Sequence, residues 1–377
     1  MSARIRIADL LVPAAGSDKA KPADSPAHGG ETKAFGYQSL DLSTLSHQIR
    51  LLQFTSSSPL NISCTMQTVD LHPQPLYWAL SYTWGPPEPT MEIMVNDEPM
   101  RIRENLYQFL STWRNTTGCA IWIDQICINQ KNDDEKNHQV NLMSQIFMKA
   151  SNVVVWLGAA ADDSDRIIAA FCKSRAEPTV EQAKQEQDGL LKIMERQYWH
   201  RVWIVQEILL ASSLTVLCGV QEFPWTVLDY CMRLIDGGTT WSGRGITANT
   251  IFTARSRFQS PRLGPDGLRD ILAAFFKSKL QCEDRRDKVF GLLGLIPSAA
   301  RIEIRYDKTL QQICEDVVRK VVQEEEFPLR SLFIEFGKDL QKWCDLPDLD
   351  VERLVDYELS NKRRHCNQSA IAKNLFN

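Results

Sequence analysis

The sequence lacks the residue spacings that mark the common metal and nucleotide sites. Its 10 Cys residues include no C-x-x-C pair and no zinc-finger spacing. Cys344, His365 and Cys366 lie close together in the sequence, but a fourth ligand is missing, so we predict no metal site. There is also no G-x-G-x-x-G, no P-loop and no H-E-x-x-H, which leaves ordinary nucleotide-binding and zinc-protease functions without support.

The sequence also lacks a strong charge bias and a long apolar run. The net charge is −4 and the basic residues are scattered, so we expect no nucleic-acid partner. No run approaches the roughly 18 apolar residues of a membrane span, and the N-terminus does not resemble a signal peptide. We therefore expect a cytoplasmic protein without a membrane span, whose cysteines are reduced, buried thiols.

Tryptophan is abundant instead, and nine of the 10 Trp residues fall between Trp78 and Trp241. This distribution places the most tightly packed part of the chain in its centre. The N-terminal residues 1–36, by contrast, are rich in Pro, Gly, Ala and charge over most of their length, which predicts a disordered segment. A length of 377 residues favours two or three domains.

Strand and helix patterns alternate through the central region. Apolar or alternating runs predict strands at 47–54, 61–71, 76–84, 119–128, 151–158 and 213–219, with a hairpin over 92–103. Helical spacing predicts helices at 104–114, 133–150 and 162–174, over most of 181–211, and at 224–235, 267–280 and 309–325. The order strand, helix, strand predicts an α/β fold with a parallel sheet, an N-terminal β extension and a C-terminal helical extension.

Asp124 is the sharpest single candidate for chemistry. It is the only charge in the apolar run IWIDQICI, so it lies at or near the C-terminal end of a buried strand. Open α/β sheets bind ligands at that edge. A carboxylate that only caps the following loop or helix is the equal alternative.

Glu207 is the second candidate. In YWHRVWIVQEILLA it lies four residues after Trp203 among apolar neighbours, where a carboxylate can serve in acid–base work. A structural ion pair, for example with Arg201, is the alternative. Cys127 with His138 and Asp124 offers a third arrangement, a thiol triad, but a Cys in an apolar run is more often inert.

These segments together resemble the HET domain of fungal heterokaryon-incompatibility proteins. The matching pieces are YWALSYTWG (77–85), ENL (104–106), IWIDQICINQ (121–130), EKNHQVNLMSQIF (135–147), NVVVWLG (152–158) and HRVWIVQEILLA (200–211). DRRDKVFGLLGLIP (284–297), followed by Tyr306, resembles the segment that often follows the domain. The resemblance implies a fungal protein of allorecognition and innate immunity that triggers programmed cell death when genetically different hyphae fuse.

The HET domain in turn looks like a remote relative of TIR domains, which implies a TIR- or flavodoxin-like sheet. Trp203-x-x-x-Glu207 is similar to the TIR Trp-Cys-x-x-Glu helix, whose Glu is catalytic in those TIR domains that cleave NAD. The sequence departs from that pattern at Ile204 and in the long insertion between Gly158 and Tyr198. The domain organisation that follows is 1–36 disordered, 37–220 HET domain with preceding strands, 221–330 helical extension and 331–377 C-terminal tail.

Three mechanisms stay open. In the first, NAD is a substrate rather than a cofactor, with Glu207 and Asp124 as catalytic residues and a pocket lined by Ser81, Tyr82, Trp84 and Trp203. In the second, the domain signals without catalysis, through assembly with itself or with other HET or NLR-type proteins by the loop Asn129–Glu135. The third is a Cys127 hydrolase. A scaffold or regulatory paralogue with no death activity is the alternative to all three.

Overall fold

The computed structural model describes residues 35–43, 45–56, 61–113, 119–172, 179–236, 246–259, 267–325 and 329–375. They form two compact units, and the chain passes between them more than once. The first unit comprises the residues up to Ile193 together with Ala211–Ile235, and the second comprises Met194–Leu210 and the residues from Asp236 onward. Most of the segment predicted to be disordered, residues 1–34, lies outside the described residues.

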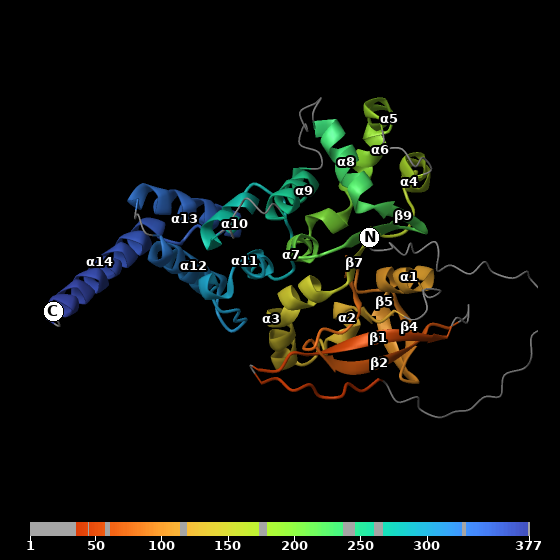
Figure 1. Ribbon diagram of the computed structural model, residues 1–377, viewed down its shortest axis with the longest axis horizontal. Coiled ribbons are helices and arrows are strands. Elements are labelled where there is room, and N and C mark those ends of the chain that lie inside the picture. The colour runs from red at the N-terminus through yellow and green to blue at the C-terminus, as the bar shows by residue number, and fades with distance from the viewer. Residues whose placement is uncertain are drawn as a thin grey trace, which may run out of the picture. The chain divides into compact units, whose positions relative to one another are not determined.

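A nine-stranded mixed sheet organises the first unit, in the order β5-β4-β2-β1-β6-β3-β7-β8-β9 (Figure 1). The strands are β1 (Gln48–Ser56), β2 (Ser63–Asp70), β3 (Trp78–Tyr82), β4 (Thr90–Val95), β5 (Glu98–Arg103), β6 (Ile121–Trp122), β7 (Asn152–Trp156), β8 (Leu214–Cys218) and β9 (Gln221–Pro224). The predicted α/β class, the N-terminal strands and the hairpin are thereby confirmed.

The centre of this sheet is parallel. β3 pairs in parallel with β6 on one side and β7 on the other, and β7 pairs in parallel with β8. Counted in chain order, these four strands lie across the sheet as second, first, third and fourth, which is the flavodoxin-like arrangement. β7 is buried at every position, because helices and the rest of the sheet cover a parallel centre on both faces.

The helices of the first unit connect and cover these strands. They are α1 (Glu104–Trp113), α2 (Asp124–Cys127), α3 (Asp133–Lys149), α4 (Ser164–Cys172), α5 (Val180–Gln185), α6 (Gln187–Met194) and α8 (Trp225–Asp236). Figure 1 shows α4, α5, α6 and α8 gathered near β9. An aromatic cluster on α1 accounts for part of the density of tryptophan, since Trp113 stacks on Phe109 and contacts Trp78.

One predicted strand is wrong in its extent. The apolar run 119–128 forms only the two residues of β6 and then turns into α2, which starts at Asp124. Ile126 and Cys127 are buried on that short helix, so their apolar character reflects helix burial and not a longer strand. The expectation that Asp124 lies at the C-terminal end of a buried strand is confirmed.

The second unit is helical. Its elements are η2 (Gln197–His200), α7 (Ile204–Leu209), α9 (Ile246–Phe258), α10 (Leu268–Phe275), α11 (Asp287–Leu293), η3 (Ser298–Ala300), α12 (Leu310–Glu324), α13 (Arg330–Cys344) and α14 (Val351–Leu375). α12, α13 and α14 pack against one another (Figure 1). Gly337 permits the close approach of α13 and α14, since a Cβ there would come within 2.5 Å of Val351 Cγ1.

Four of these helices, α9, α11, α13 and α14, occupy segments for which the sequence predicts no element. α9 lies inside the Gly-rich connection 237–267, and α14 occupies the polar C-terminal end. Among the described residues, no helix is both long and apolar enough to cross a membrane.

Candidate functional site

The candidate site begins at the carboxyl ends of the parallel strands. After β3 the chain reaches β6 on one side of it, and from β6 it crosses to β7 on the other side, so the point where the strand order reverses lies between β3 and β7. Open α/β sheets place their ligand crevices there. The last residues of the two strands, Tyr82 and Trp156, pair directly across this point.

Asn105, the second residue of α1, closes over the switch point. Its side-chain oxygen accepts a hydrogen bond of 2.9 Å from Trp156 Nε1, and its amide donates to the carbonyl of Thr83. Gly85 allows this approach, because it has a φ of 75° and a Cβ there would lie 3.3 Å from Asn105 Cβ. Sequence reasoning assigned Asn105 no role, although the ENL motif contains it. The arrangement joins β3, β7 and α1 at this edge.

Trp84 and Asp124 come together beside Asn105. The indole Nε1 of Trp84 donates to Asp124 Oδ2 at 2.8 Å, while Asp124 Oδ1 accepts from the Gln125 N–H at 2.6 Å. The guanidinium of Arg103 lies over the Trp84 ring at 4.9 Å and donates to the carbonyl of Gly85. The carboxylate at the start of α2 therefore holds the half-buried Trp84 indole, and Arg103 covers it from one face.

Ser81 and Tyr82, the other predicted pocket residues of this unit, lie inside the sheet. Both side chains are buried on β3, with exposed fractions of 0% and 1%. Their role as substrate contacts stays a prediction.

The predicted assembly loop follows Asp124 directly. Gln130 Nε2 donates to the Asp124 carbonyl at 2.9 Å, and the Asn129 N–H donates to Glu135 Oε1 at 2.7 Å. The Asn132 side chain caps α3 by accepting from the Glu135 N–H. Between these anchors, residues 131–134 are exposed. The loop is thus held at both ends and presents its middle to solvent.

A buried ion pair fixes the second anchor. Arg50 donates to both carboxylate oxygens of Glu135, at 2.6 and 2.9 Å, and both side chains are almost fully buried. Arg50 also donates to the carbonyls of Cys127 and Gln38 and lies 4.9 Å from the centroid of the Tyr37 ring. The pair ties β1, α2 and α3 together.

The pKa of Glu135 reflects this environment. Burial by itself raises the pKa of the carboxyl, but hydrogen bonds from Arg50 and Asn129, together with the charge of Arg50, outweigh burial and lower it. Glu135 is therefore held as an anion whose charge is compensated, as expected of a structural group. Glu135 is therefore the buried end of the predicted assembly loop and not part of its exposed surface.

Cys127 is not placed as a nucleophile. Its thiol is fully buried and accepts a hydrogen bond from the Ile123 N–H, and burial raises the pKa of the thiol to about 12. The ring of His138 lies 3.3 Å from the Ser43 carbonyl. A thiol with so high a pKa is protonated at neutral pH, which argues against the hydrolase alternative.

Trp203 and Glu207 belong to the second unit, where α7 carries Glu207 with an exposed fraction of 3%. The Trp203 indole donates to Asp287 Oδ2 at 3.0 Å, and the Tyr306 hydroxyl donates to Asp287 Oδ1 at 2.6 Å. Burial, with the Asp287 charge and hydrogen bond, raises the pKa of Tyr306. Asp287 thereby joins three separate sequence motifs.

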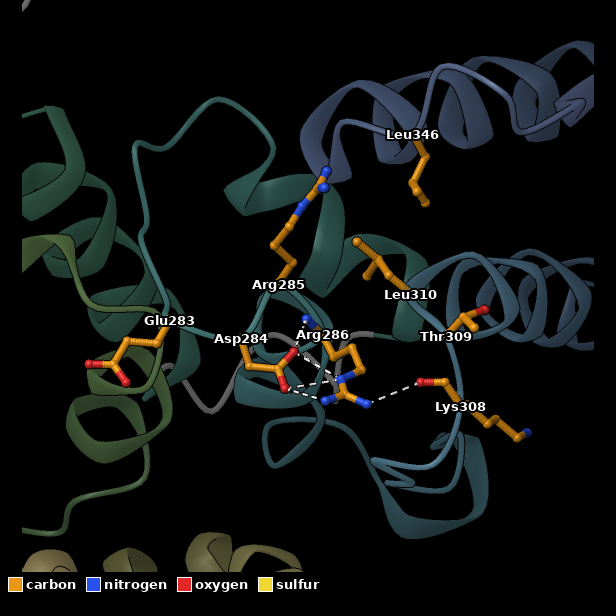
Figure 2. A pocket seen from close by; sticks show the side chains of 8 residues that line it. All are labelled: Glu283, Asp284, Arg285, Arg286, Lys308, Thr309, Leu310 and Leu346. Carbon is orange, nitrogen blue, oxygen red and sulfur yellow. Dashed lines mark hydrogen bonds and ion pairs between the residues drawn. The ribbon is translucent and has the colours of Figure 1, made fainter.

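An open cavity of about 590 Å³ lies nearby in the second unit (Figure 2). Arg286 donates hydrogen bonds to the Asp284 carboxylate and to the carbonyls of Tyr306 and Lys308. These bonds join two of the segments that line the cavity. The lining residues are Glu283, Asp284, Arg285, Arg286, Lys308, Thr309, Leu310 and Leu346.

The first unit is thus a doubly wound α/β domain whose strand-reversal point is closed by its own motif side chains. Residues 77–207 match the family model described as heterokaryon incompatibility protein (HET). The resemblance inferred from the motifs is confirmed.

One curated relative extends the similarity beyond this domain. Heterokaryon incompatibility protein 6, OR allele, of Neurospora crassa is 29% identical over 368 residues, covering 77% of this chain. The chain spans about half the length of that relative, 54%. No solved structure matches.

Proposed function

We propose that this protein acts in the cytoplasm in heterokaryon incompatibility, where its HET domain triggers programmed cell death by TIR-like self-assembly. The observation that carries the mechanism is the loop Asn129–Glu135. It exposes residues 131–134 between a buried ion pair at one end and the Asp124–Gln130 bond at the other. A surface that is held in one conformation before binding loses less entropy when a partner docks.

The charge of the loop suggests how a partner would be recognised. Asp133 and Asp134 lie exposed in the first turn of α3, so their negative charges face solvent. Partners would be further copies of this chain or other HET or NLR-type proteins. Electrostatic complementarity of this kind sets specificity and association rate more than it sets affinity.

The test is charge reversal of the loop in a fungal cell. Asp133→Lys with Asp134→Lys should abolish death and self-association at unchanged protein level. The matched control is Glu181→Lys with Asp188→Lys, which reverses two exposed acids in the first turns of α5 and α6 and should leave both readouts intact. Death and association that persist in the loop variant would refute assembly through this surface.

The second candidate is cleavage of the nicotinamide–ribose bond of NAD, favoured by the burial of Glu207. A carboxylate at 3% exposure on α7 is shielded from water, the setting in which it can stabilise an oxocarbenium-like state. The residues that we predict for this activity are Glu207 and Asp124 as catalytic groups, with Ser81, Tyr82 and Trp84 of the first unit and Trp203 of the second unit as substrate contacts.

NAD consumption separates the two mechanisms. If the chain cleaves NAD, the purified wild type should deplete NAD and Glu207→Gln should not, with thermal unfolding confirming that the variant folds. If assembly alone kills, Glu207→Gln should keep killing without NAD loss. A folded wild type that assembles and neither kills nor consumes NAD would point to the scaffold or regulatory paralogue.

A further inference from the structure

The helix that carries Glu207 packs against α11 within the second unit (Figure 1). Gly291 of α11 permits this approach, because a Cβ at that position would lie 3.2 Å from Val202 Cγ1 and 3.6 Å from Trp203 Cδ2. The segment DRRDKVFGLLGLIP, which contains α11, is therefore in direct contact with the residues that lead into α7.

Backbone hydrogen bonds hold both ends of α7. Before the helix, the Val202 N–H donates to the Gln281 carbonyl at 3.0 Å. At the other end, the buried guanidinium of Arg255 donates to the carbonyl of Ile208, the residue that follows Glu207. These bonds fix the path of the backbone, but they do not fix the direction of the Trp203 side chain.

Asp287, the first residue of α11, supplies that contact. Its Oδ2 accepts the hydrogen bond of 3.0 Å from the Trp203 indole, and its Oδ1 accepts the bond of 2.6 Å from the Tyr306 hydroxyl. Trp203 stands at the N-cap of α7, and its carbonyl accepts from the Glu207 N–H at 3.3 Å. Asp287 thus holds the residue to which the backbone of Glu207 is bonded.

We propose that Asp287 is a positioning residue for the predicted NAD site, holding Trp203 and through it Glu207 in the orientation that cleavage requires. This inference rests on the proposed cleavage of NAD. It adds to that site a residue from beyond the region 77–207 that matches the family model. The role needs a hydrogen-bond acceptor at position 287 and not a negative charge, so the two can be separated by substitution.

The chemistry of the two donors decides which substitution keeps the bond. An indole N–H can only donate, whereas a tyrosine hydroxyl can donate or accept. Asn at position 287 can therefore direct its oxygen to Trp203 and its amide N–H to Tyr306. Leu has a similar volume and offers no acceptor. Asp287→Asn should preserve the position of α7, and Asp287→Leu should not.

The first measurement follows NAD consumption by the full-length chain. Asp287→Leu should lower kcat by about 100-fold, the loss that a misplacement of about 1 Å can cause. Asp287→Asn and Tyr306→Phe should keep the wild-type kcat, because both retain the bond to Trp203. Tyr306→Phe is the matched control, since it removes a hydrogen bond to the same carboxylate. Equal losses in Asp287→Asn and Asp287→Leu would assign the role to the charge and overturn the proposal.

The second measurement does not depend on catalysis. In native-state hydrogen exchange, Asp287→Leu should lower the protection of the Glu207 amide by about 5- to 30-fold, as expected for the loss of a buried hydrogen bond. Asp287→Asn should leave it unchanged. Trp203→Phe removes the same bond from the other side and takes the place of Asp287→Leu here if that variant fails to fold.

The two measurements separate failure of the positioning role from failure of the NAD mechanism. A folded wild type that consumes no NAD rules out the cleavage, and the exchange of the Glu207 amide then judges the hydrogen bond alone. Unchanged Glu207 protection in Asp287→Leu overturns the positioning role whatever the wild type does with NAD.

Discussion

The buried pair Arg50–Glu135 allows a stability prediction that the geometry makes quantitative. The two side chains have exposed fractions of 2% and 3%, and their ends are joined by hydrogen bonds of 2.6 and 2.9 Å. Removing one partner leaves the other as an uncompensated buried charge, which typically costs about 3–5 kcal/mol. Arg50→Met and Glu135→Leu should therefore each lower the free energy of unfolding of the first unit by about 3–5 kcal/mol.

The double variant Arg50→Met with Glu135→Leu should cost less than the sum of the single changes. No charge is left buried, but the carbonyls of Cys127 and Gln38 and the N–H of Asn129 lose their partners. Each buried polar group without a partner costs about 1–3 kcal/mol, so recovery is partial. We expect a coupling energy of at least about 2 kcal/mol between the two positions.

Native-state hydrogen exchange, followed on the amides of α2 and α3, measures these losses of unfolding free energy and their coupling. It does not require the two units to unfold together. The control is the bidentate pair Arg166–Glu186, joined at 2.6 and 2.8 Å but with the Arg side chain 61% exposed. The same replacements there should cost less than about 1 kcal/mol. Equal effects at the two pairs, or strictly additive effects at Arg50 and Glu135, would refute the argument.

Two further predictions follow from the same contacts. The folded-state pKa of Glu135 is lowered, so its contribution to stability is present above the unfolded-state pKa of about 4.3 and is lost as pH falls through the folded value. The loss of unfolding free energy caused by Glu135→Gln, measured by urea unfolding, should therefore shrink between pH 6 and pH 3. A loss that stays constant over this range contradicts the prediction. Trp203→Phe removes the donor to Asp287 and should reduce exchange protection of α11 by about 1–2 kcal/mol, with Trp225→Phe as the unaffected control.

The parts of the fold that sequence predicts best are those with strong local patterns. The hairpin around Asn96 and Asp97, the buried strand β7 and the capped helix α3 carry their signals within a few residues. The prediction of a strand over 119–128 is wrong beyond Trp122, because a short buried helix and a buried strand are equally apolar and periodicity does not separate them over so few residues.

Long-range contacts explain what the sequence could not supply. Arg50 and Glu135 are 85 positions apart, and Trp203 and Asp287 are 84 apart. Neither pair has a local pattern, since each meets only because the chain folds back. Asp124 was predictable as a strand-end carboxylate, but its partner Trp84 comes from a different motif 40 positions away.

The motif residues of the region that matches the HET family model differ in how their polar groups are used, and this difference bears on mechanism. Trp84 is bonded to Asp124, Asn105 to Trp156, and Glu135 to Arg50, so these groups hold the switch-point edge and the loop ends together. Residues 131–134 of the same motif region are exposed, and the ion pair with Arg50 anchors Glu135, which follows them. A ligand at the edge would have to compete with existing bonds, whereas a protein partner can dock on the loop without breaking any of these contacts. This asymmetry is why we place assembly ahead of catalysis in the proposed function.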